Sequence, residues 1–326
     1  MDVLPTLLSY TWRSMRASDA ARLARFERAC AVVDGDSHFL GESGWMQRLQ
    51  DPQYLQQFSL LAVNHTGDIA AAAYIHFQEE TFEVQAFLDG RVHPMMRQQR
   101  LGSAVLSWME QRAALHLGRK AKGRPQVLRI MFYDRRQDAL ELFETTGYRF
   151  QYSEDELVYD LQGPLPPAVF PEDTHFAVWN EKNGHHFYEV YCDAFSTRSA
   201  KLWDEAAWRQ HFANPNDGEF LPEISLIVYH NKGPIAYTVC HADTAPTGTM
   251  PEDVWISQLG VCPEWRRRGI AVALLAETHL QMALTGVQRC VISVNVDNPG
   301  ARKLYINTGY QLLKRFTLYR KELASA

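Results

Sequence analysis

Short apolar segments alternate with helix-like stretches along the first half of the chain, and turn residues separate them. The β-branched and apolar segments 60–63 and 69–77 flank the polar turn 64–68, a pattern that predicts a β-hairpin. The complete prediction for this half is, in order, a strand from residue 11, helices 20–32 and 44–49, the hairpin, strand 82–92, helix 101–117, strand 127–133, helix 139–146 and a second hairpin over 147–161.

Proline and glycine then interrupt the pattern. The segment 163–172 contains Gly163, Pro164, Pro166, Pro167 and Pro171, so we predict a stiff linker there. After it the order of elements repeats, with strand 176–179, helices 186–195 and 205–212, hairpin 224–229 and 235–241, strand 254–261, helix 270–284, strand 291–296, a helix from 301 and a final strand from about 310. The length of 326 residues suits two domains, which we place at 1–162 and 173–326.

Short motifs support the internal repeat. Val92, Pro94 and Arg97 recur at the same spacing as Val261, Pro263 and Arg266. Likewise, Ala139-x-x-Leu142-Phe143-x-x-x-Gly147-Tyr148 recurs as Ala301-x-x-Leu304-Tyr305-x-x-x-Gly309-Tyr310. The first half is longer between these motifs, and we expect the extra residues in a polar loop over 119–125.

Composition excludes several classes of protein. A net charge of -5 gives no support for nucleic-acid binding, and no apolar run is long enough to span a bilayer. The first residues lack the basic and apolar regions of a signal peptide, so we expect a cytoplasmic location. The five cysteines are scattered without a Cys-x-x-Cys pair, which indicates neither a disulfide framework nor a metal site.

A basic turn with a glycine lies between strand 254–261 and helix 270–284. Arg266, Arg267 and Arg268 precede Gly269, and the small Ala271 follows in the first turn of the helix. A helix start offers unpaired backbone N–H groups and the positive end of the helix dipole, and a glycine lets a bulky anion approach the backbone. The turn is therefore interpreted either as a binding site for a diphosphate or as a solvated arginine cluster.

This basic turn and a second motif further along the chain together resemble the GNAT superfamily of acyl-CoA-dependent N-acetyltransferases. The resemblance rests on Arg266-x-x-Gly269-x-Ala271 after a strand and on Asn298-x-x-Ala301-x-x-Leu304-Tyr305-x-x-x-Gly309-Tyr310 further on. It implies an α/β (α+β) protein with two tandem GNAT-like domains, each a mixed, mostly antiparallel twisted sheet flanked by helices.

The resemblance also implies a chemistry for the second domain. Acetyl-CoA would be the co-substrate, and an amine, on a small molecule or a peptide, would attack its thioester directly. Tyr305 takes the role of the acid that protonates the departing thiolate, since a phenol is protonated at pH 7. The residues implied in binding acetyl-CoA are Leu259, Gly260 and Val261, whose backbone N–H groups stabilise the oxyanion, with Arg266, Arg267, Arg268, Gly269, Ile270, Ala271, Asn298 and Ala301.

Two roles stay open at the sequence level. The general base can be Asp253, Glu252 or His241, which lie at neighbouring strand ends, or a chain of water molecules; Asp253 is our candidate. Asn298 can hydrogen-bond the pantetheine arm or form an Asx turn.

The first domain departs from the pattern where chemistry is expected. In the alignment of the two halves, Arg100 stands at the position of Gly269, Phe143 at that of Tyr305, and Arg136 at that of Asn298. We expect a degenerate domain that keeps the fold without turnover; the alternative is that it still holds a CoA through the charges of Arg97 and Arg100.

The leading hypothesis is an acetyl-CoA-dependent N-acetyltransferase with its active site in the second domain. A mycothiol-synthase-like enzyme and a non-catalytic acyl-CoA-binding regulatory protein are the alternatives. Helices within 186–212 are expected to cover the acceptor pocket, and the sequence fixes neither the acceptor nor the oligomeric state.

Overall fold

The chain forms two compact units in a computed structural model that describes residues 4–5, 7, 9–34, 41–79, 82–133, 136–196, 202–212, 218–242 and 252–324. Unit 1 comprises Met1–Ser153 with Lys314–Ala326, and unit 2 comprises Glu154–Leu313. The chain therefore passes from one unit to the other twice, once within each of its two longest strands.

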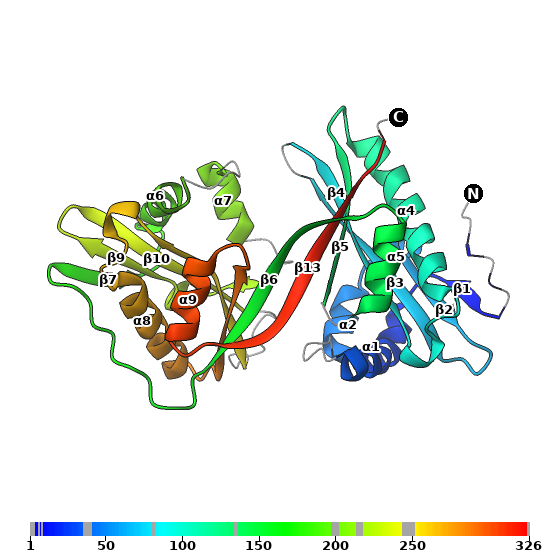
Figure 1. The fold of residues 1–326 in the computed structure, drawn as a ribbon, viewed down its shortest axis with the longest axis horizontal. Helices are drawn as coiled ribbons and strands as arrows, with labels where there is room; N and C mark the ends of the chain where they lie inside the picture. The colour runs from blue at the N-terminus through cyan, green and yellow to red at the C-terminus, as the bar shows by residue number, and fades with distance from the viewer. Residues whose placement is uncertain are drawn as a thin grey trace. The chain divides into compact units, whose positions relative to one another are not determined.

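Unit 1 is a mixed sheet with helices on both faces (Figure 1). Its strands follow the order β1-β2-β3-β4-β5-β13, and only β4 and β5 are parallel neighbours. The elements are β1 (Thr11–Arg13), a 3₁₀ turn (Ala17–Asp19), α1 (Ala20–Asp34), α2 (Glu42–Arg48), α3 (Pro52–Phe58), β2 (Ser59–Val63), β3 (Ile69–Glu79), β4 (Val84–Val92), a 3₁₀ turn (Pro94–Met96), α4 (Leu101–Lys120), β5 (Gln126–Tyr133), α5 (Gln137–Thr145), β6 (Arg149–Asp160), which begins here, and the C-terminal β13 (Gln311–Glu322).

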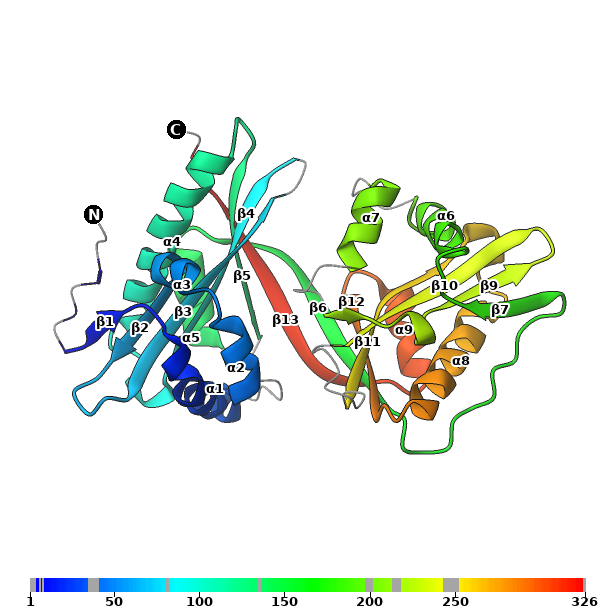
Figure 2. The same ribbon diagram turned by 180° about the vertical axis from the view of Figure 1, so that it is seen from behind.

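Alternation along the strands divides the core of unit 1 into two clusters. Leu60 and Ala62 face α4, whereas Leu61 between them faces α1 and α2. Helix α4 forms the crossover that connects β4 to β5, because two parallel strands can be joined only by a long connection. Figure 2 shows α1, α2 and α3 on one side of this sheet.

Unit 2 repeats this plan. Its strands follow the order β6-β12-β11-β10-β9-β7, β8 pairs with β10, and β11 with β12 is the parallel pair. The elements are β7 (Thr174–Val178), α6 (Gly184–Phe195), α7 (Glu205–Phe212), β8 (Glu219–Phe220), a 3₁₀ turn (Pro222–Ile224), β9 (Leu226–His230), β10 (Gly233–Ala242), β11 (Asp253–Val261), a 3₁₀ turn (Pro263–Trp265), α8 (Ile270–Leu284), β12 (Arg289–Asn295) and α9 (Pro299–Asn307).

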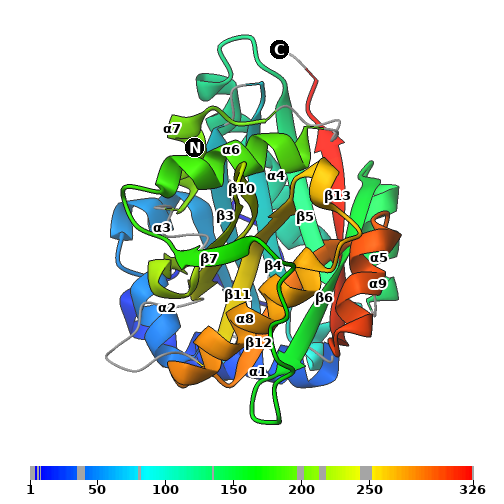
Figure 3. The ribbon, with the colours of Figure 1, turned by 90° about the vertical axis from the view of Figure 1, so that its left-hand side faces the viewer.

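The helices of unit 2 also cover opposite faces of their sheet (Figure 3). Ile227 and Tyr237 pack with α6 and α7, and Leu226 and Val228 pack with α8. The expected architecture, with a mixed and mostly antiparallel sheet between helices in each domain, is confirmed.

The two long strands are exchanged between the units. β6 pairs through Glu154–Asp160 with β12 of unit 2, and β13 pairs through Phe316–Glu322 with β5 of unit 1. The hairpin predicted over 147–161 is wrong, because Arg149–Asp160 is one continuous strand. The units also differ from the boundaries expected at residues 162 and 173, since pairing partners far apart in the chain leave no local signal.

Two further differences concern helices of unit 1. The extra length between the repeated motifs lies mostly in α4, which continues to Lys120 where a loop was expected; α8 ends at Leu284. The short helix α3 was not predicted, although Asp51 caps it by accepting from the Tyr54 N–H at 2.9 Å and Pro52 opens it.

Candidate active site

The two parallel strands of unit 2 separate partway along their length. β11 and β12 pair from Asp253–Arg289 to Ile256–Ile292, and among the described residues no pair is recorded beyond that point. On its other side β11 stays paired with β10 through Val261. Alternate backbone N–H groups from Ser257 to Val261 therefore point away from β10, into the opening between β11 and β12.

A β-bulge lies where this opening begins. The register between β10 and β11 shifts between Val239 and Cys240, which leaves Ser257 as the extra residue of β11. The bulge reverses the alternation, so Leu259 packs in the same cluster as Ile256, on the side of α8 and α9. Gly260 instead faces α6, where a Cβ atom would lie 3.1 Å from that of Ala194.

The basic turn follows β11 and leads into α8. Gly269 is the N-cap of α8 with φ 80° and ψ −5°, and Arg267 also has a positive φ of 64°. A Cβ atom added to Gly269 would meet nothing within 4 Å, so this face of the turn is open. The N–H groups that begin the helix, including those of Ile270 and Ala271, are thus accessible to an anion.

Two of the three arginine side chains in the turn are engaged within the protein. Arg266 donates from Nε to the Val261 carbonyl at 3.1 Å and from its guanidinium to the Ala194 carbonyl at 2.7 Å. The Arg268 guanidinium lies over the Trp265 ring, 4.9 Å from its centroid. Arg266 therefore fastens the turn to the last turn of α6, and an anion would meet mainly the backbone.

Asn298 caps the helix that follows β12. Its Oδ1 accepts from the Ala301 N–H at 3.2 Å, and Pro299 occupies the first helical position. Since β11 and β12 are parallel, Asn298 and the basic turn lie at the same edge of the sheet. The side-chain carbonyl oxygen of Asn298 is therefore engaged in the Asx turn, one of the two roles considered for this residue.

Tyr305 lies on α9 and is 6% exposed. It packs in the same apolar cluster as Leu259, and its ring centroid is 5.7 Å from that of Tyr310. Tyr305 therefore packs in the same cluster as a residue of the open stretch of β11.

Asp253 lies away from these residues. It begins β11 and forms a two-pronged ion pair with Arg289, at 2.5 and 2.7 Å. The six residue steps to Leu259 correspond to about 20 Å along a strand. The structure does not bring Asp253 to the open stretch of β11, and nearby Glu252 uses its carbonyl to accept from the Gln288 and Arg289 N–H groups.

His241 lies closer to the bulge. Its Nδ1 is 2.8 Å from the Ser257 hydroxyl, which donates to the Val239 carbonyl at 3.1 Å, so Nδ1 is the donor to Ser257. The imidazole is buried, and its ring lies 5.7 Å from that of Phe220, on the face of the sheet that α6 and α7 cover. Of the three residues considered for the base, His241 is the one next to the bulge.

Gln258 was missed at the sequence level. Its Oε1 accepts from the Tyr237 hydroxyl at 2.6 Å and from the Trp208 indole N–H at 3.1 Å, which fixes the orientation of the amide. The residues come from β11, β10 and α7, and no spacing along the chain signals such a group.

A buried polar trio below α9 was also missed. The Tyr310 hydroxyl lies 2.7 Å from His279 Nε2 and 3.1 Å from Cys290 Sγ, and Tyr159 stacks on the imidazole at 4.2 Å. Burial lowers the pKa of His279 to about 4 and raises the pKa of Cys290 to about 12. All three groups are therefore neutral at pH 7.

Unit 1 reproduces the backbone of this site with different side chains. Arg100 is the N-cap of α4 with φ 64° and ψ 4°, and Gln98 has φ 62°. Arg97 donates to the Val92 carbonyl at 3.3 Å, as Arg266 does to Val261. Arg136 occupies the N-cap position of α5 without a side-chain cap hydrogen bond, whereas Asn298 caps α9 through its side-chain oxygen. Phe143 lies on α5 and contacts Phe132.

Comparisons with known proteins find similarity to acetyltransferases in the second half of the chain. The sequence profile of the Acetyltransferase (GNAT) family matches residues 166–310. The N-alpha-acetyltransferase 30 of Schizosaccharomyces pombe is 31% identical over 99 residues, which cover 30% of this chain and 63% of that protein. The match therefore spans less than two thirds of this relative.

Solved structures resemble the whole chain. A GCN5-related N-acetyltransferase from Sphaerobacter thermophilus superposes with a TM-score of 0.79 at 24% identity, covering 98% of this chain and 97% of that one. A tandem GNAT protein from the clavulanic acid biosynthesis pathway gives 0.68 at 13% identity, covering 96% and 98%. The tandem arrangement inferred from the repeat is thus confirmed as a fold.

The described part of the chain contains neither a membrane-spanning helix nor a cluster of metal ligands. No helix there combines the length and the apolar character needed to cross a membrane. No three His, Cys, Asp or Glu side chains there converge as a set of metal ligands.

Proposed function

We propose, from the match of residues 166–310 to the GNAT family of acetyltransferases, that unit 2 transfers an acetyl group from acetyl-CoA to an amine. The observation that carries the proposal is the coincidence of three features in one unit. These are the opening between β11 and β12, the glycine turn that begins α8, and Tyr305 in the cluster that contains Leu259.

The residues of the basic turn fit the diphosphate of CoA. Gly269 leaves its outer face open, and the first N–H groups of α8 point outward as donors for an anion. With Arg266 held by two carbonyl groups, the binding energy comes mainly from the backbone and the helix dipole. Acetyl-CoA supplies the activated acetyl group when it binds.

We assign the reacting carbonyl to the open stretch of β11. Backbone N–H groups among Leu259, Gly260 and Val261 that point away from β10 would donate to the oxygen as negative charge develops on it. Because β10 holds this strand in register, these donors are oriented before the substrate binds. The bulge at Ser257 sets which residues reach this position.

The proton on the amine leaves toward the face covered by α6 and α7. We place the acceptor there because Gly260 and Gln258 face these helices, and His241 on the same face contacts the bulge. His241, whose ring lies beside the bulge, is a better-placed base for the amine proton than Asp253, whose carboxylate is paired with Arg289. The thiolate receives its proton from the Tyr305 hydroxyl.

The acceptor class follows from the family and one relative. An amine on a small molecule or a peptide is the expected nucleophile, and the relative of 31% identity is named an N-alpha-acetyltransferase. Peptide N-termini therefore belong in the substrate panel, together with lysine side chains, polyamines and amino sugars.

The experiment measures acetyl transfer from labelled acetyl-CoA to this panel by the full-length chain. We expect turnover with one amine class, loss of turnover in Gly269→Arg, and a large fall in kcat in Tyr305→Phe. Gly286→Arg, which adds the same side chain at another open glycine of unit 2, is the matched control. CoA binding without any turnover would instead support a non-catalytic acyl-CoA-binding protein, and no CoA binding would overturn both.

A further inference from the structure

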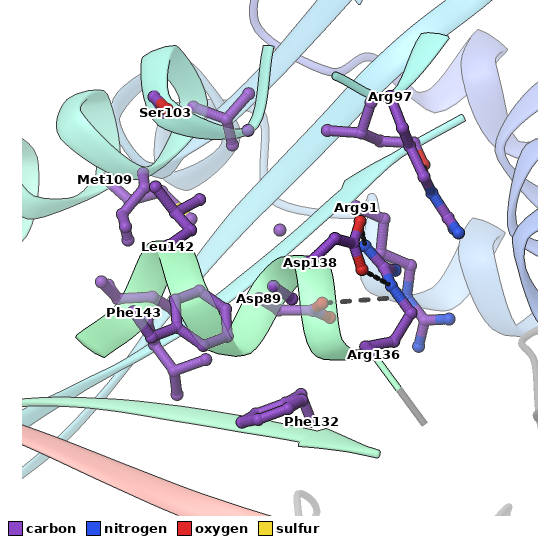
Figure 4. A pocket seen from close by; sticks show the side chains of 18 of the residues that line it. Asp89, Arg91, Arg97, Ser103, Met109, Phe132, Arg136, Asp138, Leu142 and Phe143 are labelled. Carbon is purple, nitrogen blue, oxygen red and sulfur yellow. Dashed lines mark hydrogen bonds and ion pairs between the residues drawn. The ribbon is translucent and has the colours of Figure 1, made fainter. Parts of the chain in front are cut away.

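Unit 1 contains a cavity of about 280 Å³ that the acetyltransferase proposal does not use (Figure 4). It forms where β4 and β5 separate, because their parallel pairs run only from Val84–Gln126 to Phe87–Arg129. The later residues of both strands, with α4 and α5, line the resulting space. Its volume suits a ligand of only a few carbon atoms in length.

One side of the cavity is apolar. The contributing side chains come from four elements and include Leu88 and Val105, Met109, Phe132, Leu142 and Phe143. Figure 4 shows Met109, Leu142 and Phe143 grouped on the same side of the pocket. Such a lining binds a hydrocarbon body without requiring hydrogen bonds from it.

The other side is a charged mouth that already holds a carboxylate. The Arg97 guanidinium donates to both oxygens of Asp34 at 2.8 Å, and Arg136 donates to the same carboxylate at 3.1 Å. Two guanidinium groups thus converge on one carboxylate at the rim of an apolar space, and all three residues line the cavity.

Most of the charged side chains at the mouth are already paired. Arg91 lies 3.5 Å from Glu27 and 3.9 Å from Asp89, and Arg136 pairs with Asp138 at 2.9 Å. Within the described chain no ion pair is recorded for Arg100, which is exposed and supplies the uncompensated charge.

We propose that this cavity is a non-catalytic binding site for a small monocarboxylic acid with an apolar body. The hydrocarbon part fills the space between β4 and β5, and the carboxylate lies at the mouth near Arg97, Arg100 and Arg136. A single negative charge on the ligand pairs with Arg100 at the mouth, and Asp34 competes with the ligand for the guanidinium groups of Arg97 and Arg136. Phe143 offers no proton to a leaving group, so the site binds without turnover.

Hexanoate is the probe, with hexanol as its uncharged counterpart and CoA as the competing class. Isothermal titration of the full-length chain is expected to show one site for hexanoate at millimolar concentrations and much weaker binding of hexanol. Arg100→Gln should weaken hexanoate binding at least about tenfold, because it removes a charge-assisted hydrogen bond to the ligand carboxylate. Asp34→Asn should strengthen it, because the competing carboxylate is removed.

Two further variants locate the site. Ala139→Phe places a ring among the lining residues without emptying the core and should abolish binding. Arg119→Gln, an exposed arginine at the end of α4, is the matched control and should change nothing. Hydrogen exchange of each variant checks that unit 1 stays folded.

Four outcomes would overturn the inference. Equal binding of hexanol and hexanoate would remove the role of the charged mouth. Hexanoate binding that survives both Arg100→Gln and Ala139→Phe, or no binding at all, would remove the site. Displacement of hexanoate by CoA that depends on Arg100 would identify a second nucleotide site instead.

Discussion

Arg100 and Gly269 adopt nearly the same left-handed conformation at the N-cap of corresponding helices, with φ 64° and ψ 4° for the first and φ 80° and ψ −5° for the second. Each lies at the end of a basic turn. In unit 1 this turn follows β4, which separates from β5, and in unit 2 it follows β11, which separates from β12. The backbone of the turn is thus independent of the glycine, and the side chain at this position is the part that differs between the units.

The first prediction is that Gly269→Arg folds and loses CoA. Arginine in a left-handed conformation costs roughly 1–2 kcal/mol, and the turn of unit 1 already carries one. The added side chain projects from the open face of the turn, so we expect CoA affinity in calorimetry to fall at least tenfold. Gly286→Arg is the matched control, since Gly286 also has a positive φ of 90° and open surroundings. Unchanged CoA affinity in Gly269→Arg would show that the cradle lies elsewhere.

The second prediction concerns the proton on the thiolate. Tyr305→Phe keeps the ring in the apolar cluster and removes the hydroxyl, so kcat and kcat/KM should both fall by about 10²–10⁴. Acetyl-CoA affinity should stay nearly constant because the packing is retained. Tyr229→Phe, which removes a hydroxyl 2.7 Å from His186, serves as the control in the same unit. Wild-type turnover in Tyr305→Phe would leave Tyr305 as a packing residue and water as the acid.

Local patterns predicted the elements of the site well. Helix 270–284 was predicted with the bounds that the structure gives, because a glycine turn and a long apolar helix leave strong signals. The repeat was also visible, because Val92, Pro94 and Arg97 recur at the spacing of Val261, Pro263 and Arg266. Sequence spacing alone did not decide which residue at the neighbouring ends of β10 and β11 is the general base. Only the strand register in the structure narrowed that choice.

Long-range relationships were not predictable from the sequence. The hydrogen bond of Arg266 with Ala194 spans 72 positions, the clamp of Arg97 on Asp34 spans 63, and the bond of Gln258 with Trp208 spans 50. The exchange of β6 and β13 is the largest such case, because both strands satisfy the same apolar pattern in either domain. Only pairing partners decide which sheet each strand completes.

The third prediction is a pH dependence of stability from His279. Burial holds the pKa of its imidazole at about 4, below the ordinary value of 6.5 that applies when the chain unfolds. The unfolded chain therefore binds a proton that the folded chain does not, and unit 2 loses stability as the pH falls from 6.5 to about 4. The contribution of this residue is roughly 3 kcal/mol, at about 1.4 kcal/mol per pKa unit.

Denaturant unfolding at a series of pH values tests this contribution. His279→Gln should be less stable at pH 7 and should show a shallower fall between pH 6.5 and 4 than the wild type. His230→Gln, whose ring is partly exposed beside Trp265, is the control. An equal slope in His279→Gln and the wild type would show that other groups cause the acid sensitivity.

The fourth prediction is that residues at the C-terminus stabilise unit 1, although they follow the whole of unit 2 in sequence. Phe316–Glu322 pair with Val127–Tyr133, Leu318 and Tyr319 are buried, and Thr317 lies 2.7 Å from Ser153 through their hydroxyl groups. Deletion of 314–326 removes these contacts and exposes the edge of β5, so unit 1 should unfold or lose most of its protection. β12 keeps its partner β6, so unit 2 should retain its own.

Hydrogen exchange with mass spectrometry resolves the two units in one experiment. In the deletion variant we expect fast exchange over Gln126–Tyr133 and slow exchange over Arg289–Asn295. Deletion of 324–326 alone leaves every β5–β13 pair in place and should exchange as the wild type does. A fragment that ends in the proline-rich linker retains β6 but lacks β13, so by the same reasoning it should not fold as unit 1 unless 311–322 is joined to it. Retained protection of β5 after deletion of 314–326 would mean that β6 can replace β13 beside it, and that the exchange of strands is not fixed by the sequence.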